Sequence, residues 1–215
     1  MATEMNDELA SSSPSPTGRI PAWLSGRIGI LLALLGTMWA IEIVDTVVLS
    51  DRLQGNGIRP RTIDGLDGIA WSPFLHGGFG HLIGNTIPFF VLSGLTLASG
   101  LARYVKASAI IIVLGGALTW AFAIGSNENH IGASGWVFGL IGFLVAAAVL
   151  DRKAISFLTG AIALVFYGGT VLTGVVPTDG ISWEGHLFGF IAGIAAAKLI
   201  SQRRQTSHGE VATAS

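Results

Sequence analysis

The sequence predicts an all-α membrane protein, a bundle of six transmembrane helices, and three observations support this fold class. Of its 215 residues, 51% are hydrophobic and only 12% are charged. Its mean hydropathy of +0.65 exceeds what the core of a soluble protein of this size requires. Its 30 glycines suit helices in lipid, where small residues let two backbones approach closely. Most of the apolar surface is therefore expected to face lipid.

Six apolar stretches have the length and composition of membrane-spanning helices. A span needs about 20 apolar residues, because the hydrocarbon core is roughly 30 Å thick and each helical residue rises about 1.5 Å. Charged residues or clusters of Gly, Pro and Asn bound each stretch. The predicted spans are residues 28–50, 82–102, 107–125, 134–150, 154–174 and 186–200.

The remaining segments divide the chain into a membrane domain over residues 27–201 and two polar tails. Residues 1–26 contain the run SSSPSPTG and are too poor in apolar side chains to fold alone, so we expect a disordered tail. The first apolar run begins after Arg27 and predicts a span rather than a secretory signal. Residues 51–80 form a long outer loop that we expect to be structured, and residues 202–215 form a polar C-terminal tail.

Lysine and arginine predict the orientation, because they favour the cytoplasmic side of a membrane. With the N-terminus inside, nine of them are cytoplasmic: Arg19, Arg27, Arg103, Lys106, Arg152, Lys153, Lys198, Arg203 and Arg204. Three are on the outer side: Arg52, Arg59 and Arg61. Both termini are therefore predicted to be cytoplasmic, in a multi-pass protein of the cell membrane.

The composition also excludes several kinds of site. A net charge of −1 provides no basic surface for a nucleic acid, whose phosphates need neutralising cations. Cysteine is absent, so the chain has no disulfide framework, no thiol nucleophile and no cysteine metal site.

Few polar side chains fall within or at the ends of the predicted spans. Because such residues are costly in a membrane, each is a functional candidate. They are Glu42, Asp45, His81, Asn85, Thr86, Ser134 and His186.

Three of these polar groups are predicted to share one depth. Counting from each to the cytoplasmic charge that ends its helix gives 18 residues for Asn85, 17 for Ser134 and 17 for His186. At about 1.5 Å per residue, each lies roughly 25 to 27 Å above the inner boundary. Because the second, fourth and sixth spans run from outside to inside, the count predicts one buried site that opens to the outer face.

Ser134 is the candidate nucleophile of this site. It begins the fourth span in the segment GASG, where Gly132 and Gly135 let backbone and substrate approach a hydroxyl. Both glycines are also predicted to be helix-packing residues. A serine hydroxyl is weak until a base takes its proton, and His186 is placed to do so from another helix at the same depth. Glu184 is two residues from His186 and is expected to point elsewhere, so no acid is obvious as a third member. The residues predict a Ser134–His186 dyad.

His81 and Asn85 are candidate donors to an oxyanion. Attack on a peptide carbonyl creates a negative charge that needs preorganised donors, especially where water is scarce. The two residues are four apart and share one helical face. Together with the backbone N–H of Ser134, they are placed to donate to this charge.

A glycine repeat predicts how the sixth span packs. Gly185, Gly189 and Gly193 recur every four residues, which gives a face on which another helix can approach closely. His186 is next to this face. The repeat is therefore expected to press His186 toward the fourth span.

Three segments resemble the motifs of rhomboid intramembrane proteases. GASG around Ser134 is similar to GxSG, and HLFGFIAG, from His186 to Gly193, is similar to HxxGxxxG. HGGFGHLIGN, from His76 to Asn85, is similar to the HxxxxHxxxN of the second helix. Trp71 is followed by Ser72, whereas many family members have a Trp-Arg pair in the first loop.

The resemblance covers about residues 28–200 and implies a six-helix, rhomboid-like serine endopeptidase. Ser134 would be its nucleophile, His186 its general base, and His81 with Asn85 its oxyanion donors. The implied substrates are single-span membrane proteins, cut in the lipid bilayer or beside it. No metal or organic cofactor is implied.

Other interpretations of the same residues stay open. GASG alone is typical of a packing site or helix cap, and His81 with Asn85 is compatible with a structural pair. His76 and His130 are expected to be solvated loop residues without a catalytic role.

Two other functions are also compatible with the sequence. One is a membrane protein that binds other membrane segments without cutting them. The other is a small proton-coupled transporter that uses Glu42, Asp45 and the histidines as a relay.

Overall fold

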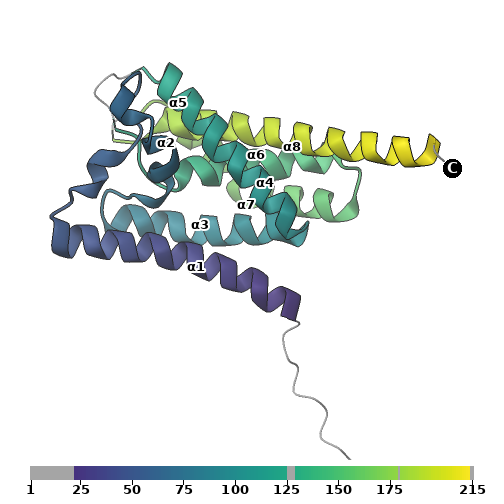
Figure 1. The fold of residues 1–215 in the computed structure, drawn as a ribbon, viewed down its shortest axis with the longest axis horizontal. Helices are drawn as coiled ribbons and strands as arrows, with labels where there is room; N and C mark the ends of the chain where they lie inside the picture. Colours follow the sequence, from purple (N-terminus) through teal and green to yellow (C-terminus); the bar gives the residue numbers. More distant parts are fainter. Residues whose placement is uncertain (1–21, 125–128, 179, 214–215) are drawn as a thin grey trace, which may run out of the picture.

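The computed structural model describes residues 22–124, 129–178 and 180–213, and this part of the chain is mostly helical (Figure 1). Strand-like pairing within these residues is limited to an isolated bridge between Ile58 and His130. The helices, with η for 3₁₀ and π helices, are α1 (Ala22–Val44), η1 (Asp45–Leu49), η2 (Leu53–Asn56), η3 (Ile63–Gly65), α2 (Gly68–Trp71), η4 (Ser72–Phe74), α3 (Phe79–Ala98), α4 (Leu101–Ile110), η5 (Ile111–Gly115), α5 (Gly116–Phe122), α6 (Ser134–Leu150), α7 (Ala154–Gly174) and α8 (Trp183–Thr213).

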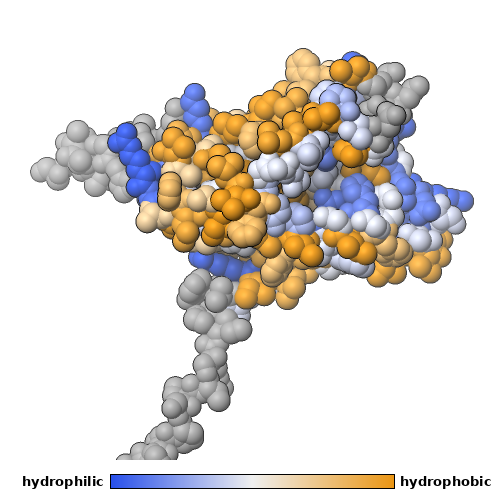
Figure 2. Space-filling view, turned by 180° about the vertical axis from the view of Figure 1, so that it is seen from behind, coloured by the Kyte–Doolittle hydropathy of each residue, from blue (hydrophilic) through white to orange (hydrophobic). Residues whose placement is uncertain are grey.

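Within the part of the chain that the structure describes, four helical stretches are long and apolar enough to cross a membrane: Ser25–Leu49, Phe79–Ala98, Leu101–Phe122 and Ala154–Gly174. α6 is a shorter apolar helix of 17 residues. Figure 2 shows one face of the molecule, where apolar residues cover much of the surface and hydrophilic residues gather mainly toward its ends. The chain is therefore a multi-pass membrane protein. Its six crossings and the cytoplasmic location of both termini stay predictions.

The predicted end of the second span, residue 102, and the predicted start of the third span, residue 107, were both wrong. α3 ends at Ala98 rather than at residue 102, because Gly100 adopts a φ of +116° that a helix cannot continue. Arg103 therefore lies in α4, and the count of 18 residues from Asn85 to Arg103 crosses a helix break. α4, η5 and α5 follow as one helical stretch.

The two ends of the membrane domain also differ from the prediction. The predicted N-terminal tail reached residue 26, but α1 already begins at Ala22, and residues 1–21 lie outside the described residues. α8 continues past the predicted end of its span to Thr213, so the polar C-terminal segment extends a helix. An apolar stretch marks the part of a helix that lipid covers, and the helix itself can run further.

The interior of the bundle is built on α6, with α8 alongside it (Figure 1). The side chains from Trp136 to Leu144 are all buried. A Cβ at Gly189 would overlap the carbonyl oxygen of Gly135, and a Cβ at Gly193 would overlap that of Gly139. Gly189 and Gly193 thus lie where the two backbones touch.

The outer loop is attached to the end of α5. The backbone N–H of Arg61 donates to the Trp120 carbonyl at 2.9 Å, and its guanidinium donates to the carbonyl of Ala123. In return, the indole N–H of Trp120 donates to the carbonyl of Thr62 at 2.8 Å. Because the last carbonyls of a helix lack partners within it, Arg61 satisfies groups that would otherwise be left unpaired.

A buried ion pair lies at the other end of the bundle, away from the outer loop. Arg103 of α4 pairs with Asp151, which follows α6, and both side chains are almost completely buried. Asp151 also accepts hydrogen bonds from Ser156 of α7 at 2.7 Å and Ser201 of α8 at 2.6 Å. Burial alone would raise the pKa of Asp151, but the hydrogen bonds from Ser201 and Ser156 and the positive charge of Arg103 outweigh it and lower this pKa.

We expect Asp151→Ala to lower the free energy of unfolding by about 3 to 5 kcal/mol, because Arg103 would remain buried without its partner. The measurement is thermal or denaturant unfolding of the purified protein in detergent micelles. A double variant, Arg103→Met with Asp151→Ala, should recover most of the loss, since it removes both charges. A double variant as unstable as Asp151→Ala would contradict this account.

Candidate active site

One cavity brings together the four residues that the sequence singled out. It has a volume of about 550 Å³ and lies between the start of α3, the start of α6 and the segment that leads into α8. Ser134, His186, His81 and Asn85 all line it. The remaining lining residues include Gly77, Gly80, Gly84, Ile131, Gly180, Ile181 and Ser182.

Ser134 and His186 are within hydrogen-bonding distance. Nε2 of His186 lies 2.8 Å from Oγ of Ser134, and Nδ1 of His186 lies 2.8 Å from the carbonyl oxygen of Gly174. A carbonyl only accepts, so Nδ1 must carry the ring proton of a neutral His186. Nε2 then presents its lone pair to the serine hydroxyl, which is the arrangement that a general base needs.

The ring of His186 is also fixed from its face and its edge. Phe138 stacks on it, with 4.2 Å between ring centroids and 7° between ring planes. Phe138 is one turn beyond Ser134 on α6, so the same helix supplies the hydroxyl and the support for the ring. A Cβ at Gly174 would overlap the Phe138 ring and lie 3.3 Å from Nδ1 of His186, which only glycine avoids.

Glu184 does not act as a third member of the pair, as expected from its spacing. Its carboxylate is buried and accepts a hydrogen bond from the backbone N–H of Ile124 at 3.3 Å. The Gly174 carbonyl occupies the place at Nδ1 of His186 where an acid would stand.

His81 is held with one ring nitrogen turned toward the serine segment. The backbone N–H of Gly77 donates to Nδ1 of His81 at 3.3 Å, so Nε2 must carry the proton of the neutral ring. A Cβ placed on Gly132 would come within 2.6 Å of this Nε2, which shows that the ring edge faces the segment before Ser134. His81 therefore presents an N–H donor on the serine side.

Asn85 lies one turn further along the same face and is mostly buried. Its amide nitrogen donates to the carbonyl of His81 at 3.0 Å. An amide nitrogen has two protons, so a second donor is left for the cavity that Asn85 lines.

Gly132 was predicted as a helix-packing residue, and the structure assigns it a different place. It precedes α6 with a φ of +112°, a conformation that glycine adopts readily and other residues rarely do. The space in front of its Cα is filled by the ring of His81. Gly132 thus lets the chain turn into α6 while His81 approaches.

His76 and His130 are buried rather than solvated, so this expectation was wrong. Nε2 of His76 accepts the backbone N–H of Ala133 at 3.4 Å, and Nδ1 of His130 lies 2.6 Å from Oγ of Ser182. Burial, with His81 adjacent, lowers the pKa of His76 to about 4. His76 is therefore neutral near pH 7 and able to accept this hydrogen bond.

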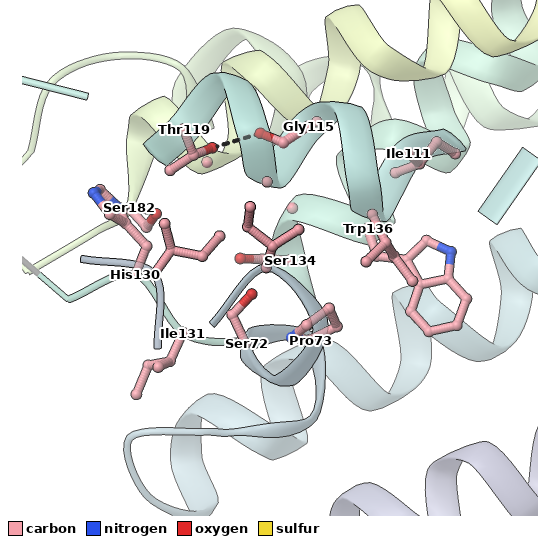
Figure 3. A pocket seen from close by; sticks show the side chains of 18 residues that line it. Ser72, Pro73, Ile111, Gly115, Thr119, His130, Ile131, Ser134, Trp136 and Ser182 are labelled. Atoms are coloured by element: carbon pink, nitrogen blue, oxygen red, sulfur yellow. Dashed lines mark hydrogen bonds between the residues drawn. The ribbon is translucent and has the colours of Figure 1, made fainter. Parts of the chain in front are cut away.

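A second, smaller cavity adjoins Ser134 (Figure 3). Its volume is about 50 Å³, and it lies between the outer loop, the η5–α5 stretch and the start of α6. Ser72, Thr119 and Ser182 contribute hydroxyl groups to its wall. The rest of its wall is largely apolar and includes Ile58, Ile69 and Ile111.

Some residues of the site carried no sequence signal. Phe138 is one of many apolar residues on α6, and its position four residues after Ser134 is the single clue to its role. Gly174 is 12 residues from His186 along the chain, so only the fold brings its carbonyl to the ring. In the described ranges, no group of three or more His, Asp or Glu side chains is arranged to hold a metal ion.

Fold and site together define a helical, multi-pass membrane protein in which a serine and a histidine from two helices share a cavity. The Rhomboid domain family matches residues 66–203, and the chain belongs to this family.

Relatives occur in several bacteria. The chain is 42% identical, over 86% of its length and 79% of the relative, to an uncharacterized protein of Mycobacterium tuberculosis. It is 36% identical to an uncharacterized protein of Mycobacterium leprae, over 90% of this chain and 78% of the relative. It is 26% identical to a putative rhomboid protease, YdcA, of Bacillus subtilis, over 61% of this chain and 65% of the relative.

We expect Gly174→Ala to reduce labelling of Ser134 by a fluorophosphonate probe about tenfold or more. The added methyl group would displace Phe138 or His186, and a small misplacement of reacting groups is costly. Gly169→Ala on the same helix is the matched control, because a Cβ there meets open space. Equal labelling of Gly174→Ala and Gly169→Ala would refute the positioning role of Gly174.

We expect the free energy of unfolding to decrease as the pH is lowered from about 6.5 to 4, because of His76. Its pKa drops from 6.5 in the unfolded chain to about 4 in the folded protein, so the unfolded chain binds a proton that the folded protein excludes. The contribution is complete above about pH 6.5 and is lost as the pH falls toward 4, by about 3 kcal/mol at most. Unfolding of wild type and His76→Gln at pH 7 and pH 5 measures it, and the variant should show the smaller change.

Proposed function

We propose that this protein is an intramembrane serine endopeptidase that cuts single-span membrane proteins near the outer end of their transmembrane segment. Ser134 is the nucleophile and His186 the general base, and His81 and Asn85 donate to the oxyanion. The site opens to the extracytoplasmic side, and both termini are cytoplasmic. Family membership supports the reaction class, and the relative from Bacillus subtilis is named a putative rhomboid protease.

The observation that supports this most directly is the contact between Ser134 and His186. Their side chains approach to 2.8 Å, and the Gly174 carbonyl orients the imidazole so that Nε2 accepts the serine proton. As Oγ bonds to the substrate carbonyl carbon, Nε2 takes this proton and then gives it to the leaving amine as the C–N bond breaks. Water hydrolyses the resulting acyl-enzyme by the same route.

Negative charge develops on the substrate oxygen in the first step. His81 presents its Nε2–H on the serine side, and Asn85 has a second amide proton available. The backbone N–H groups at the start of α6 lack partners within the helix and carry partial positive charge. These donors are in place before the charge appears, which is the condition for stabilising a transition state.

Hydrolysis of the acyl-enzyme also requires water. The main cavity, which opens to the extracytoplasmic side, gives water a route to Ser134. The hydroxyl groups of Ser72, Thr119 and Ser182 line the small cavity beside it (Figure 3).

A substrate helix has to unwind before it can be cut, because its carbonyls are engaged in hydrogen bonds. Substrates with Gly, Pro or other helix-weakening residues near their outer end are therefore favoured. Gly77, Gly80 and Gly84 form a wall of the main cavity without side chains, which leaves room for an extended segment beside α3.

Two alternatives receive less support from the side-chain geometry. A proton relay through Glu42 and Asp45 is disfavoured, because the carboxylate of Asp45 accepts the backbone N–H of Leu53 at 2.8 Å and that of Glu42 faces the backbone N–H of Gly78. A protein that only binds membrane segments has no use for a serine held 2.8 Å from an oriented imidazole.

We expect the wild-type protein to cleave a single-span membrane protein, both in detergent and in liposomes. Ser134→Ala should reduce the cleavage rate by at least about 10⁴-fold. His186→Gln should lose a similar factor, and fluorophosphonate should label wild type but not Ser134→Ala. Mass spectrometry of the products maps the cut. Cleavage at the wild-type rate by Ser134→Ala would rule out the assignment, and a wild type that binds substrate without cutting or labelling would favour the binder.

A further inference from the structure

Two carboxylates are buried at the outer end of the first helical stretch. Glu42 in α1 and Asp45 at the start of η1 are 1% and 2% exposed. A buried carboxylate is costly unless donors satisfy it, so each must serve a contact. Neither belongs to the proposed catalytic machinery, and they engage different parts of the protein.

Glu42 engages the turn that leads into α3. Its carboxylate faces the backbone N–H of Gly78, and one carboxylate oxygen lies 3.5 Å from the hydroxyl oxygen of Thr46 on its own helical stretch. Gly78 adopts a φ of +104° and is the residue before α3. The turn therefore combines an unusual backbone conformation with an anchor from another helix.

The same turn holds His81 from two sides. The N–H of Gly77 donates to Nδ1 of His81 at 3.3 Å, and the carbonyl of Gly78 accepts the backbone N–H of His81 at 3.1 Å. The ring orientation and the proton on Nε2 thus depend on where the peptide units of Gly77 and Gly78 lie. Glu42 acts on the N–H of Gly78, which belongs to the peptide unit between these two.

We infer that Glu42 is a positioning residue, which acts through the Gly77–Gly78 turn to keep the Nε2–H of His81 directed at the oxyanion. This inference rests on the proposed function, since it assigns Glu42 a part in the same reaction. Without the anchor, the turn can move, Gly77 no longer specifies the tautomer, and His81 loses its fixed direction. The expected loss is then in the chemical step and not in substrate binding.

Asp45 provides a matched control within the same stretch. It is equally buried and lies one turn from Glu42, but its carboxylate accepts the backbone N–H of Leu53 at 2.8 Å. That contact secures the chain between η1 and η2, away from α3. A general effect of removing a buried acid from this stretch would appear in both residues, whereas an effect through His81 would appear in Glu42 alone.

The experiment measures kcat and KM for cleavage of a single-span substrate by the full chain in liposomes. The variants are Glu42→Leu, which keeps the volume but removes the acceptor, Glu42→Gln, which keeps an acceptor oxygen, and Asp45→Leu. Each is compared with wild type and is also made in a His81→Ala background. Thermal unfolding of each variant reports its stability separately.

We expect Glu42→Leu to lower kcat about tenfold with KM changed less than about twofold, while Glu42→Gln and Asp45→Leu stay within about threefold of wild type. In the His81→Ala background, Glu42→Leu should have almost no further effect, because the group through which it acts is gone. Such coupling is not produced by a residue that only supports the fold.

Two outcomes would overturn the inference. In the first, Glu42→Leu and His81→Ala reduce kcat independently, so that their effects multiply in the double variant. In the second, Glu42→Leu and Asp45→Leu reduce kcat equally. If Glu42→Leu does not fold, Glu42→Gln decides, and a folded Glu42→Gln that loses more than tenfold in kcat overturns it. The proposed function fails separately: in that case wild type does not cleave the substrate. An active wild type with additive losses contradicts only the role of Glu42.

Discussion

The site depends on the close contact between α6 and α8 across their glycines. Lipid tails are as apolar as the side chains, so helices in a membrane gain little from burying apolar surface and are held by tight packing instead. Gly189 and Gly193 touch the carbonyls of Gly135 and Gly139, and no larger residue fits at either position. This contact brings the starts of the two helices side by side, and with them Ser134 and His186.

At the outer ends of the helices, several side chains form hydrogen bonds to backbone groups. His76 accepts the N–H of Ala133, Arg61 donates to the end of α5, and Glu184 accepts the N–H of Ile124. A backbone group left unpaired in an apolar environment costs several kcal/mol, so each of these contacts stabilises the segment that it holds. The outer loop and the cavity around Ser134 are therefore joined by hydrogen bonds.

The sequence was most informative where a polar residue interrupts an apolar stretch. Ser134, His186, His81 and Asn85 could be singled out because burying such groups is costly, and they line one cavity. The end of α3 was misplaced because an apolar pattern continues across the bend at Gly100. The contributions of Phe138 and Gly174 could not be predicted, since an apolar side chain and a backbone carbonyl acquire their roles only when helices meet.

The shortness of α6 has a consequence for how the protein responds to its membrane. Its 17 residues span about 25 Å, whereas the first helical stretch has 25 residues and α7 has 21. α6 is largely enclosed by other helices, so this difference in length is taken up within the protein and the lipid need not thin around it. Hydrophobic mismatch then acts on the tilt of the longer outer helices. Ser134, at the start of this shorter inner helix, is then shielded from changes in bilayer thickness.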